Sequence, residues 1–259
     1  MKPLFLESEL PVDDLTRVGL WKDGKPAISS ENLHAMLAGR RSELITLENV
    51  QADSFLIRQL DVKLSLHRSA SGWISLQAHP IHHHIQKHPL LNEKEMEQLT
   101  GKSLSNIAKT LDEADGKVTT RIFEYDDQTK EFISYTPQEV QPPERVNGEL
   151  LTPKQKEAFQ FGEPVKLSDG TTFQHSAAES KGILSDRIAL VISVIMDGGI
   201  SYLLLRGLRN LLKDNQPKKD EYTAGFKMAL AAMERQQAQK DLPQVDLQSM
   251  QRQRYGPSR

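Results

Sequence analysis

Apolar residues recur at helical spacing over the beginning of the chain, in two short runs that each end at a glycine. The first run begins at Pro11 and stops before Gly19, with an apolar residue at every third position between them. Proline in the first turn and glycine just beyond the last turn are typical helix boundaries. The second run starts at Ser30, the expected N-cap, and stops at Gly39. The pattern predicts two short helices in this region.

Two stretches further along the chain alternate in polarity with the period of a β-strand. Residues 61–81 and 117–136 each contain two alternating runs around a short polar turn, which predicts two antiparallel hairpins. Between them, Asn92 and Glu95 have the spacing of a capping box, so we expect a helix to begin there. Residues 104–111 carry apolar side chains at helical spacing and are predicted to be helical as well.

The second half of the chain opens with its clearest helix start, Thr152 followed by Pro153. Together these elements predict an α+β fold of short helices and antiparallel hairpins, with a smaller C-terminal unit and a helical tail. We expect an N-terminal α+β domain over residues 1–145 and a C-terminal unit with an apolar helical segment over residues 146–214. A helical to disordered tail is expected over residues 215–259.

The most apolar stretch, residues 188–205, contains one charged residue, Asp197. Its length is at the short end of what a membrane-spanning helix needs. About a dozen aliphatic side chains at roughly −0.3 to −0.6 kcal/mol each oppose a cost of about 2.5–3.5 kcal/mol for the central aspartate. A folded domain would instead bury the stretch as two short core helices that turn at Gly198 and Gly199. We expect the buried helices, with a membrane span as the alternative.

Charge and composition narrow the range of partners. The net charge is −2, but residues 205–259 carry +5, because eleven Lys and Arg stand against six Asp and Glu there. A mildly acidic body with a basic end is poorly suited to hold nucleic acid over a broad face. Arg206, Arg209 and Lys213 are candidates for a few weak nucleic-acid contacts. The chain has no cysteine, which excludes disulfides, a thiolate nucleophile and thiolate zinc ligands.

A histidine cluster raises the question of a metal or catalytic site, because five of the eight histidines lie within residues 79–88. An extended backbone would place His82 and His84 on one face and His83 on the other. The segment itself contains no Asp or Glu that could add a carboxylate ligand. We therefore interpret it as a polar strand end that leads into a loop, and a metal-dependent enzyme is the alternative.

The remaining candidates for chemistry are weaker. Residues 100–105 contain Gly-Lys-Ser, but Met96 occupies the position of the first glycine that a phosphate-binding loop requires. His175 and Ser176 are expected to have structural roles. We predict no catalytic residue, no metal ligand and no cofactor.

Four segments carry a resemblance to a known family. They are LPVDDLTRVGL, ENLHAMLAGRRSELITL, VKLSLHRSASGWISLQAHPI and GELLTPKQKEAFQFGEPVKLSDGTTF, within roughly residues 10–180. Their order resembles uncharacterised two-domain proteins of unknown function from mobile and conjugative elements of Bacteroidetes, some of them associated with topoisomerase- or primase-like proteins. The resemblance implies a role near DNA-processing partners and carries no established catalytic residue.

We therefore expect a non-enzymatic accessory or interaction protein of a mobile genetic element, located in the cytoplasm and bound to a protein partner. In the tail, Tyr222, Phe226, Leu230 and Met233 form a narrow apolar stripe that could dock into a partner groove as one helix face. Packing of the stripe on the chain's own body is the alternative. A second hypothesis is a structural or conjugation/secretion component associated with the inner membrane and anchored through residues 188–205.

Overall fold

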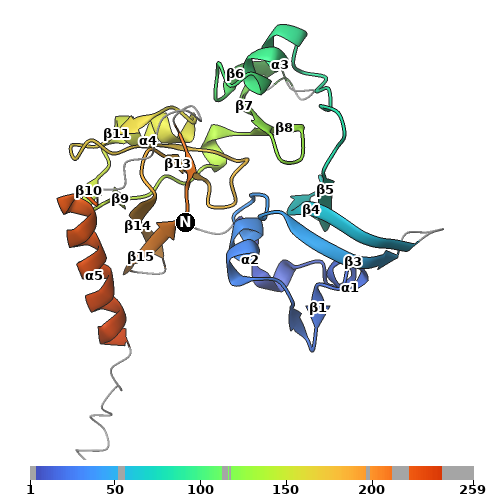
Figure 1. The fold of residues 1–259 in the computed structure, drawn as a ribbon, viewed down its shortest axis with the longest axis horizontal. Helices are drawn as coiled ribbons and strands as arrows, with labels where there is room; N and C mark the ends of the chain where they lie inside the picture. The colour runs from blue at the N-terminus through green and yellow to red at the C-terminus, as the bar shows by residue number, and fades with distance from the viewer. Residues whose placement is uncertain are drawn as a thin grey trace, which may run out of the picture.

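The computed structural model describes residues 4–51, 56–112, 116, 118–196, 199–211 and 222–240. Within these residues, short helices combine with five small sheets, and all strand pairs but one are antiparallel. The predicted α+β class is confirmed. Figure 1 shows three parts of the chain: an N-terminal part in blue, a middle part in green, and a C-terminal part in yellow to red.

The N-terminal part packs short helices against a three-stranded sheet. Its elements are η1 (Glu7–Glu9), α1 (Val12–Arg17), β1 (Trp21–Lys22), β2 (Lys25–Pro26), α2 (Ser30–Leu37), β3 (Ile45–Gln51), β4 (Leu56–Arg68) and β5 (Ile74–Pro80). Both predicted helices are present, but the N-cap of α2 is Ser29 and not Ser30, because the Ser29 side chain accepts from the Asn32 amide. The predicted hairpin is β4 paired with β5, and Leu64 of β4 shares one core with Leu15 of α1.

The middle part is a three-stranded antiparallel sheet with one α-helix. It consists of α3 (Glu93–Thr100), β6 (Ile107–Asp112), β7 (Val118–Asp126), β8 (Glu131–Tyr135) and η2 (Pro137–Glu139). Asn92 and Glu95 form the predicted capping box, and β7 with β8 is the second predicted hairpin. The helix predicted over residues 104–111 is wrong. Ile107 and Leu111 belong to β6, where a spacing of four also keeps both side chains on one face of a strand.

The C-terminal part contains two four-stranded sheets and two α-helices. Its elements are β9 (Arg145–Val146), β10 (Glu149–Leu150), α4 (Pro153–Gln160), β11 (Val165–Lys166), β12 (Thr172–His175), β13 (Ile183–Ser185), β14 (Ala189–Met196), β15 (Gly199–Arg206), β16 (Arg209–Asn210) and α5 (Ala224–Lys240). The strand orders are β10-β9-β14-β15 and β11-β12-β13-β16. Thr152 caps α4 together with Gln155, as the sequence predicts. Strand β9 begins at Arg145 and pairs with β14. The domain boundaries at residues 145 and 214 stay predictions.

The apolar stretch 188–205 is a β-hairpin, so the predicted apolar helical segment is wrong. Strands β14 and β15 pair antiparallel over eight residues. Leu190 and Ile192 face one core of the C-terminal part, while Ala189 and Val191 face another. A strand that is buried on both faces has a continuous apolar sequence without alternation, which is why the stretch resembles a buried helix.

The hairpin also overturns the alternative of a membrane-spanning helix at this stretch, because its residues are extended. Across the described ranges, no helix combines the length and the apolar character that crossing a bilayer requires. Gly199 is the first residue of β15, whereas Asp197 and Gly198, the other residues of the predicted turn, lie outside the described residues.

The tail helix α5 packs on the hairpin face that carries Ala189, as Figure 1 shows at its left side. Phe226 and Ala229 are the buried residues of α5 in this contact. At the helix start, the Thr223 hydroxyl accepts from the Phe226 amide over 3.1 Å and donates to Asp169 Oδ2 over 2.6 Å. The beginning of α5 is thereby fixed to the turn between β11 and β12.

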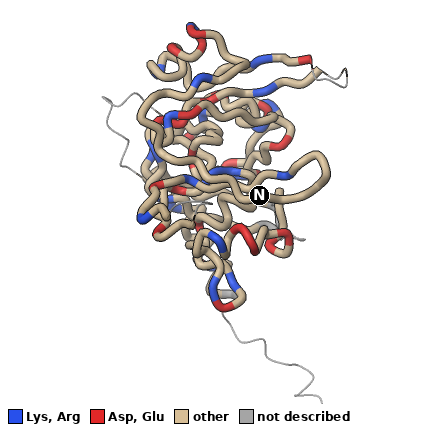
Figure 2. Tube along the Cα trace, turned by 90° about the vertical axis from the view of Figure 1, so that its right-hand side faces the viewer, with Lys and Arg blue, Asp and Glu red and all other residues tan. Residues whose placement is uncertain are grey.

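Charges of both signs are distributed over all three parts. Figure 2 shows Lys and Arg interspersed with Asp and Glu along the described part of the chain. This distribution differs from the continuous basic face with which proteins hold nucleic acid over many phosphates.

Candidate functional site

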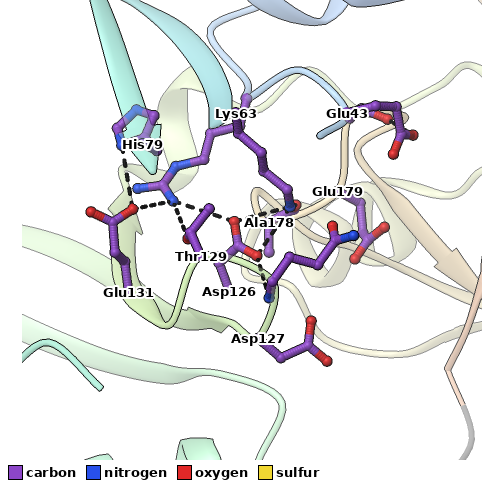
Figure 3. A network of polar contacts seen from close by, with 12 residues as sticks. Glu43, Lys63, His79, Asp126, Asp127, Thr129, Glu131, Ala178 and Glu179 are labelled. Atoms are coloured by element: carbon purple, nitrogen blue, oxygen red, sulfur yellow. Dashed lines mark hydrogen bonds and ion pairs between the residues drawn. The ribbon is translucent and has the colours of Figure 1, made fainter. Parts of the chain in front are cut away.

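A cluster of buried charges lies where the three parts of the chain meet (Figure 3). Lys63 on β4 is 2% exposed, and its ammonium group donates to Asp126 Oδ1 over 3.0 Å and to the Ala178 carbonyl over 3.1 Å. Asp126 ends β7 and Ala178 follows β12, so one side chain joins all three parts. Both charges are removed from water, and each therefore depends on the presence of the other.

Arg41 extends this charge cluster from the segment after α2. Its Nη1 donates to Glu131 Oε2 over 2.7 Å, to Thr129 Oγ1 over 3.0 Å and to Asp126 Oδ2 over 3.3 Å. The acceptors belong to the turn between β7 and β8 and to the strands beside it. The N-terminal part thus supplies the cations and the middle part supplies the anions that hold the two together.

Two of the clustered histidines reach a carboxylate on the middle part. His79 Nδ1 lies 3.4 Å from Glu131 Oε2, and His82 Nε2 lies 3.4 Å from Glu131 Oε1. Burial acts to raise the pKa of Glu131, but the hydrogen bond with His79 and the charge of Arg41 lower this pKa to about 2. His79 lies in β5 and His82 just beyond it, so the expected strand end is present. Among the described residues, no three His, Cys, Asp or Glu side chains are grouped so as to hold a metal ion.

The segment after α2 also fixes the loop between β12 and β13. Arg40 Nε donates to the Ser180 carbonyl over 2.9 Å, and the Ser180 hydroxyl donates to Glu43. Burial lowers the pKa of Arg40 to about 10, which leaves the guanidinium charged at neutral pH. The N-terminal part therefore holds the C-terminal part through these polar contacts as well as through Lys63.

Glu124, two residues before Asp126 on β7, is a buried carboxyl that neutral donors hold in place. Its Oε2 accepts from the Ser176 hydroxyl over 2.8 Å and from the Ala178 amide over 3.2 Å. Tyr135 lies close to this carboxyl, and burial together with the neighbouring Glu124 raises the pKa of the Tyr135 hydroxyl. Burial raises the pKa of Glu124 to about 7, so this carboxyl keeps a proton up to near neutral pH.

The raised pKa of Glu124 predicts a dependence of stability on pH. The folded state keeps the proton of Glu124 up to about pH 7, whereas the ordinary pKa of the group is 4.5. The stability that this carboxyl contributes is therefore fully present below about pH 4.5 and is lost as the pH rises through 7. We expect it to reduce the free energy of unfolding by about 3 kcal/mol over this window.

Urea denaturation of the wild type and of Glu124→Gln, at about pH 5 and about pH 8, measures this loss. Glutamine has the shape of the protonated carboxyl and does not ionise, so the variant is expected to gain stability relative to the wild type as the pH rises. Glu144→Gln, at a half-exposed carboxylate, should keep the wild-type pH dependence. Parallel pH profiles of the wild type and Glu124→Gln would contradict a protonated Glu124.

The three residues predicted to contact nucleic acid, Arg206, Arg209 and Lys213, differ from one another in their surroundings. Arg209 pairs with Asp127 over 2.8 Å and with Glu179 over 2.9 Å, and the hydrogen bond to Asp127 raises the pKa of Arg209. The charge of Arg209 is thus compensated within the protein. Arg206, at the end of β15, is exposed, and Lys213 lies outside the described residues. A nucleic-acid contact at these three positions stays a prediction.

The apolar stripe predicted to bind a partner packs largely against the rest of the protein. Phe226 and Met233 are 4% and 7% exposed, and Leu230 packs on the hairpin of β14 and β15. These side chains are covered in this conformation and do not offer a free helix face. Tyr222 is 44% exposed and stacks on Phe226 with ring centroids 4.5 Å apart. Packing on the body, the alternative, accounts for the stripe, and a partner contact at Tyr222 stays a prediction.

An exposed groove lies between α1 and the tip of the hairpin of β4 and β5. It has a volume of about 480 Å³, and Val12 on one wall faces Gly72 and Trp73 on the other. The Trp73 side chain is 76% exposed and that of Val12 is 41% exposed. The walls are fixed to one another, because Asp14 Oδ2 on α1 accepts from the Leu76 amide on β5 over 3.0 Å. Large apolar side chains therefore face solvent on a rigid surface.

The rim of this groove is acidic. Three carboxylates, those of Glu9, Asp13 and Asp14, line it together with the cation Arg17. Glu9 pairs with Arg68 over 3.1 Å and Asp14 with Arg17 over 3.7 Å, whereas Asp13 has no ion pair with another described residue. The sequence alternation places Trp73 on the polar face of its strand, opposite to Ile74, and predicts no site at this position. A tryptophan on a solvent-facing position is the sequence signal that indicates the groove.

The fold defines an α+β protein with an exposed groove on its N-terminal part. Residues 5–90 match the family model described as a protein of unknown function (DUF4099). No curated protein and no solved structure matches the chain. The matched residues contain the whole groove and the cations Arg41 and Lys63. A domain of unknown function is thus present here, while an origin in mobile elements of Bacteroidetes stays a prediction.

Proposed function

We propose that the protein is a non-enzymatic interaction protein, and that its groove at Trp73 binds a positively charged segment of a partner protein. The proposal rests on one observation, the 76% exposure of Trp73 at the rim of an acidic groove. Covering an exposed indole with a partner removes apolar area from water, which favours association. Tryptophan is also enriched among the few residues that dominate the binding energy of protein interfaces.

The charge of the rim determines the chemistry of the partner. Asp13 attracts lysine or arginine, because Glu9 and Asp14 already pair with Arg68 and Arg17. Val12 and Trp73 offer apolar surface to the aliphatic stem of such a residue or to a neighbouring apolar side chain. A cation over the indole face gains additional attraction from the ring. The lining holds more carboxylates than cations, which disfavours phosphate groups and supports a protein as the partner in preference to a nucleic acid.

This chemistry agrees with the role that the resemblance implies, beside DNA-processing proteins of a mobile genetic element. Proteins that hold DNA present Lys and Arg to its phosphates, and such segments complement the carboxylates of the groove. The accessory role, the mobile element and a cytoplasmic location are parts of the proposal, and the resemblance is their support.

The buried polar groups bond to other groups within the fold, which supports a non-enzymatic role. Lys63 and Asp126 satisfy one another between the parts of the chain. Burial lowers the pKa of His175 to about 3, which keeps this imidazole neutral, and its Nδ1 lies 2.9 Å from the Gly182 carbonyl. The Ser176 hydroxyl is 4% exposed and donates to a carboxylate inside the protein. These groups connect elements of the fold and lie away from the groove.

Replacing Trp73 with alanine is expected to weaken the binding of a basic peptide about thirtyfold, since the variant lacks the indole that the bound peptide would cover. The probe is a short peptide of lysine and serine with a central leucine, titrated calorimetrically into the full chain. Asp13→Lys, a reversal of charge at an exposed position, is expected to weaken binding about tenfold and to reduce its dependence on salt.

The matched control is Val118→Ala, which truncates another apolar side chain that is 65% exposed and lies outside the groove. It should bind the basic peptide as the wild type does, with circular dichroism showing that all variants are folded. A second peptide, with glutamate in place of lysine, should not bind. Equal affinity for both peptides, or equal affinity of Trp73→Ala and Val118→Ala, would refute the proposal.

A further inference from the structure

Strand β15 forms the open edge of the sheet β10-β9-β14-β15. All eight of its residues pair with β14 on one side, and on the other side they have no backbone partner among the residues that the structure describes. Natural edge strands are usually short, charged, interrupted by proline or covered, because an open apolar edge accepts another strand. From Ser201 to Leu205, β15 is uncharged and only partly buried.

A hollow of about 400 Å³ runs along this edge. Four consecutive residues of β15 line it: Leu203, Leu204, Leu205 and Arg206. Consecutive side chains of a strand point to opposite faces of the sheet. A hollow that touches four of them in succession runs along the strand at its outer edge, and Ile192 places part of it over the face that carries Leu203. The open hydrogen-bonding groups of β15 therefore face this hollow.

The two walls of the hollow differ in character. Ile192 pairs with Leu203 and shares its face, which makes one wall apolar. The other wall is α2, with Glu31, His34 and Ala38, and Figure 1 shows α2 beside the hairpin of β14 and β15. Because α2 stands next to the open edge, a single extended strand fits there at the usual spacing of about 4.8 Å. With α2 as its opposite wall, the hollow is bounded on the far side, which favours a single strand over the whole sheet of a second copy.

Two cations lie at one end of the hollow. Lys181 lines it together with Arg206, and a Cβ atom built on Gly207 would lie 3.8 Å from Lys181 Nζ, so the ammonium group is beside the end of β15. The side chains of Lys181 and Arg206 form no ion pair or hydrogen bond with another described residue. Two uncompensated cations side by side favour a carboxylate at this end.

We propose that β15 binds an extended segment of a partner protein as an additional strand of its sheet. The segment supplies backbone groups to the open edge, apolar side chains at alternate positions toward Ile192 and Leu203, and an acidic side chain next to Lys181 and Arg206. This surface is separate from the groove at Trp73, and it does not depend on the function proposed for that groove.

A labelled peptide of alternating valine and threonine that ends in glutamates tests the proposal by fluorescence anisotropy with the full chain. We expect saturable binding. Methylation of alternate backbone nitrogens of the peptide removes hydrogen-bond donors and keeps the side chains, and it should weaken binding at least about tenfold. Hydrogen exchange should slow at those amides of β15 that do not bond to β14.

Charge reversal tests the end of the hollow without disturbing a core. Arg206→Glu and Lys181→Glu should each weaken the acidic peptide about tenfold and strengthen a peptide that ends in lysines. Lys87→Glu, a reversal at a side chain that is 83% exposed and far along the chain from the hollow, should change neither affinity.

Four results would overturn the proposal. The first is the absence of peptide binding at concentrations up to about 1 mM, and the second is equal binding of the methylated peptide. The third is protection of the β15 amides that depends only on the concentration of the chain, which would show that a second copy covers the edge. The fourth is protection of the same amides by a short DNA strand that excludes the peptide, which would show that Arg206 serves nucleic acid instead.

Discussion

An Asp126→Ala variant is expected to lose about 3–5 kcal/mol of unfolding free energy relative to the wild type. The substitution removes the anion that Lys63 and Arg41 share. Lys63 is 2% exposed, so its ammonium group would keep a charge that neither water nor a counter-ion compensates. Urea denaturation followed by circular dichroism measures the loss.

Two further variants test whether the loss of unfolding free energy comes from the unpaired buried charge. Glu144→Ala removes one partner of a half-exposed pair, in which Lys156 Nζ lies 2.6 Å from the carboxylate, and should cost less than about 1 kcal/mol. Lys63→Met combined with Asp126→Leu removes both buried charges and should recover most of the loss. If Asp126→Ala costs no more than Glu144→Ala, the charge cluster does not hold the three parts together.

Truncation of Leu190 to alanine is expected to lower the free energy of unfolding by about 2–5 kcal/mol. Leu190 on β14 is completely buried in the core that also contains Phe159 and Phe173. The substitution removes apolar area from this core and leaves a cavity that the surrounding side chains fill only in part. Chemical denaturation at equilibrium measures the change.

Met228→Ala is the matched control, because the Met228 side chain on α5 is 74% exposed. It should change the free energy of unfolding by less than about 0.5 kcal/mol. An equally small effect of Leu190→Ala would show that the hairpin of β14 and β15 is not part of the folded core. The apolar stretch 188–205 would then not be buried inside the protein.

The helices with strong caps are predictable from the sequence because their signals are local. The Asn92 side chain accepts from the Glu95 amide while the Glu95 side chain accepts from the Asn92 amide, and Thr152 and Gln155 form the same reciprocal pair. Each hydrogen bond spans three residues, so no tertiary contact is needed to specify it. The tight hairpins of the first two parts are predictable for the same reason.

The sequence predicts helices at residues 188–205, where the structure has a hairpin, because both faces of this hairpin are buried. An apolar run without alternation is compatible with a helix or with a strand, and periodicity alone does not separate the two. Two signals favour strands, namely the β-branched residues from Val191 to Val194 and the Asp197–Gly198 dipeptide, which is typical of hairpin turns.

The charge cluster could not be predicted, because its residues are far apart in sequence and look solvated one by one. Lys63 lies between Val62 and Leu64 on what alternation assigns to the polar face, and its acceptor Asp126 is 63 positions away. The carboxylate beside the histidines is unpredictable for the same reason. Their own segment contains no Asp or Glu, and Glu131 reaches them from another strand.

The division of charges between the parts restricts how the N-terminal domain is reused in other chains during evolution. The matched residues 5–90 carry Arg41 and Lys63, whereas their counter-charges Asp126 and Glu131 lie outside the domain. A gene fusion that joins this domain to a new neighbour must also supply acidic side chains at the junction, or replace both cations. Such recombination therefore succeeds most readily when the domain is inherited together with the strand pair that follows it.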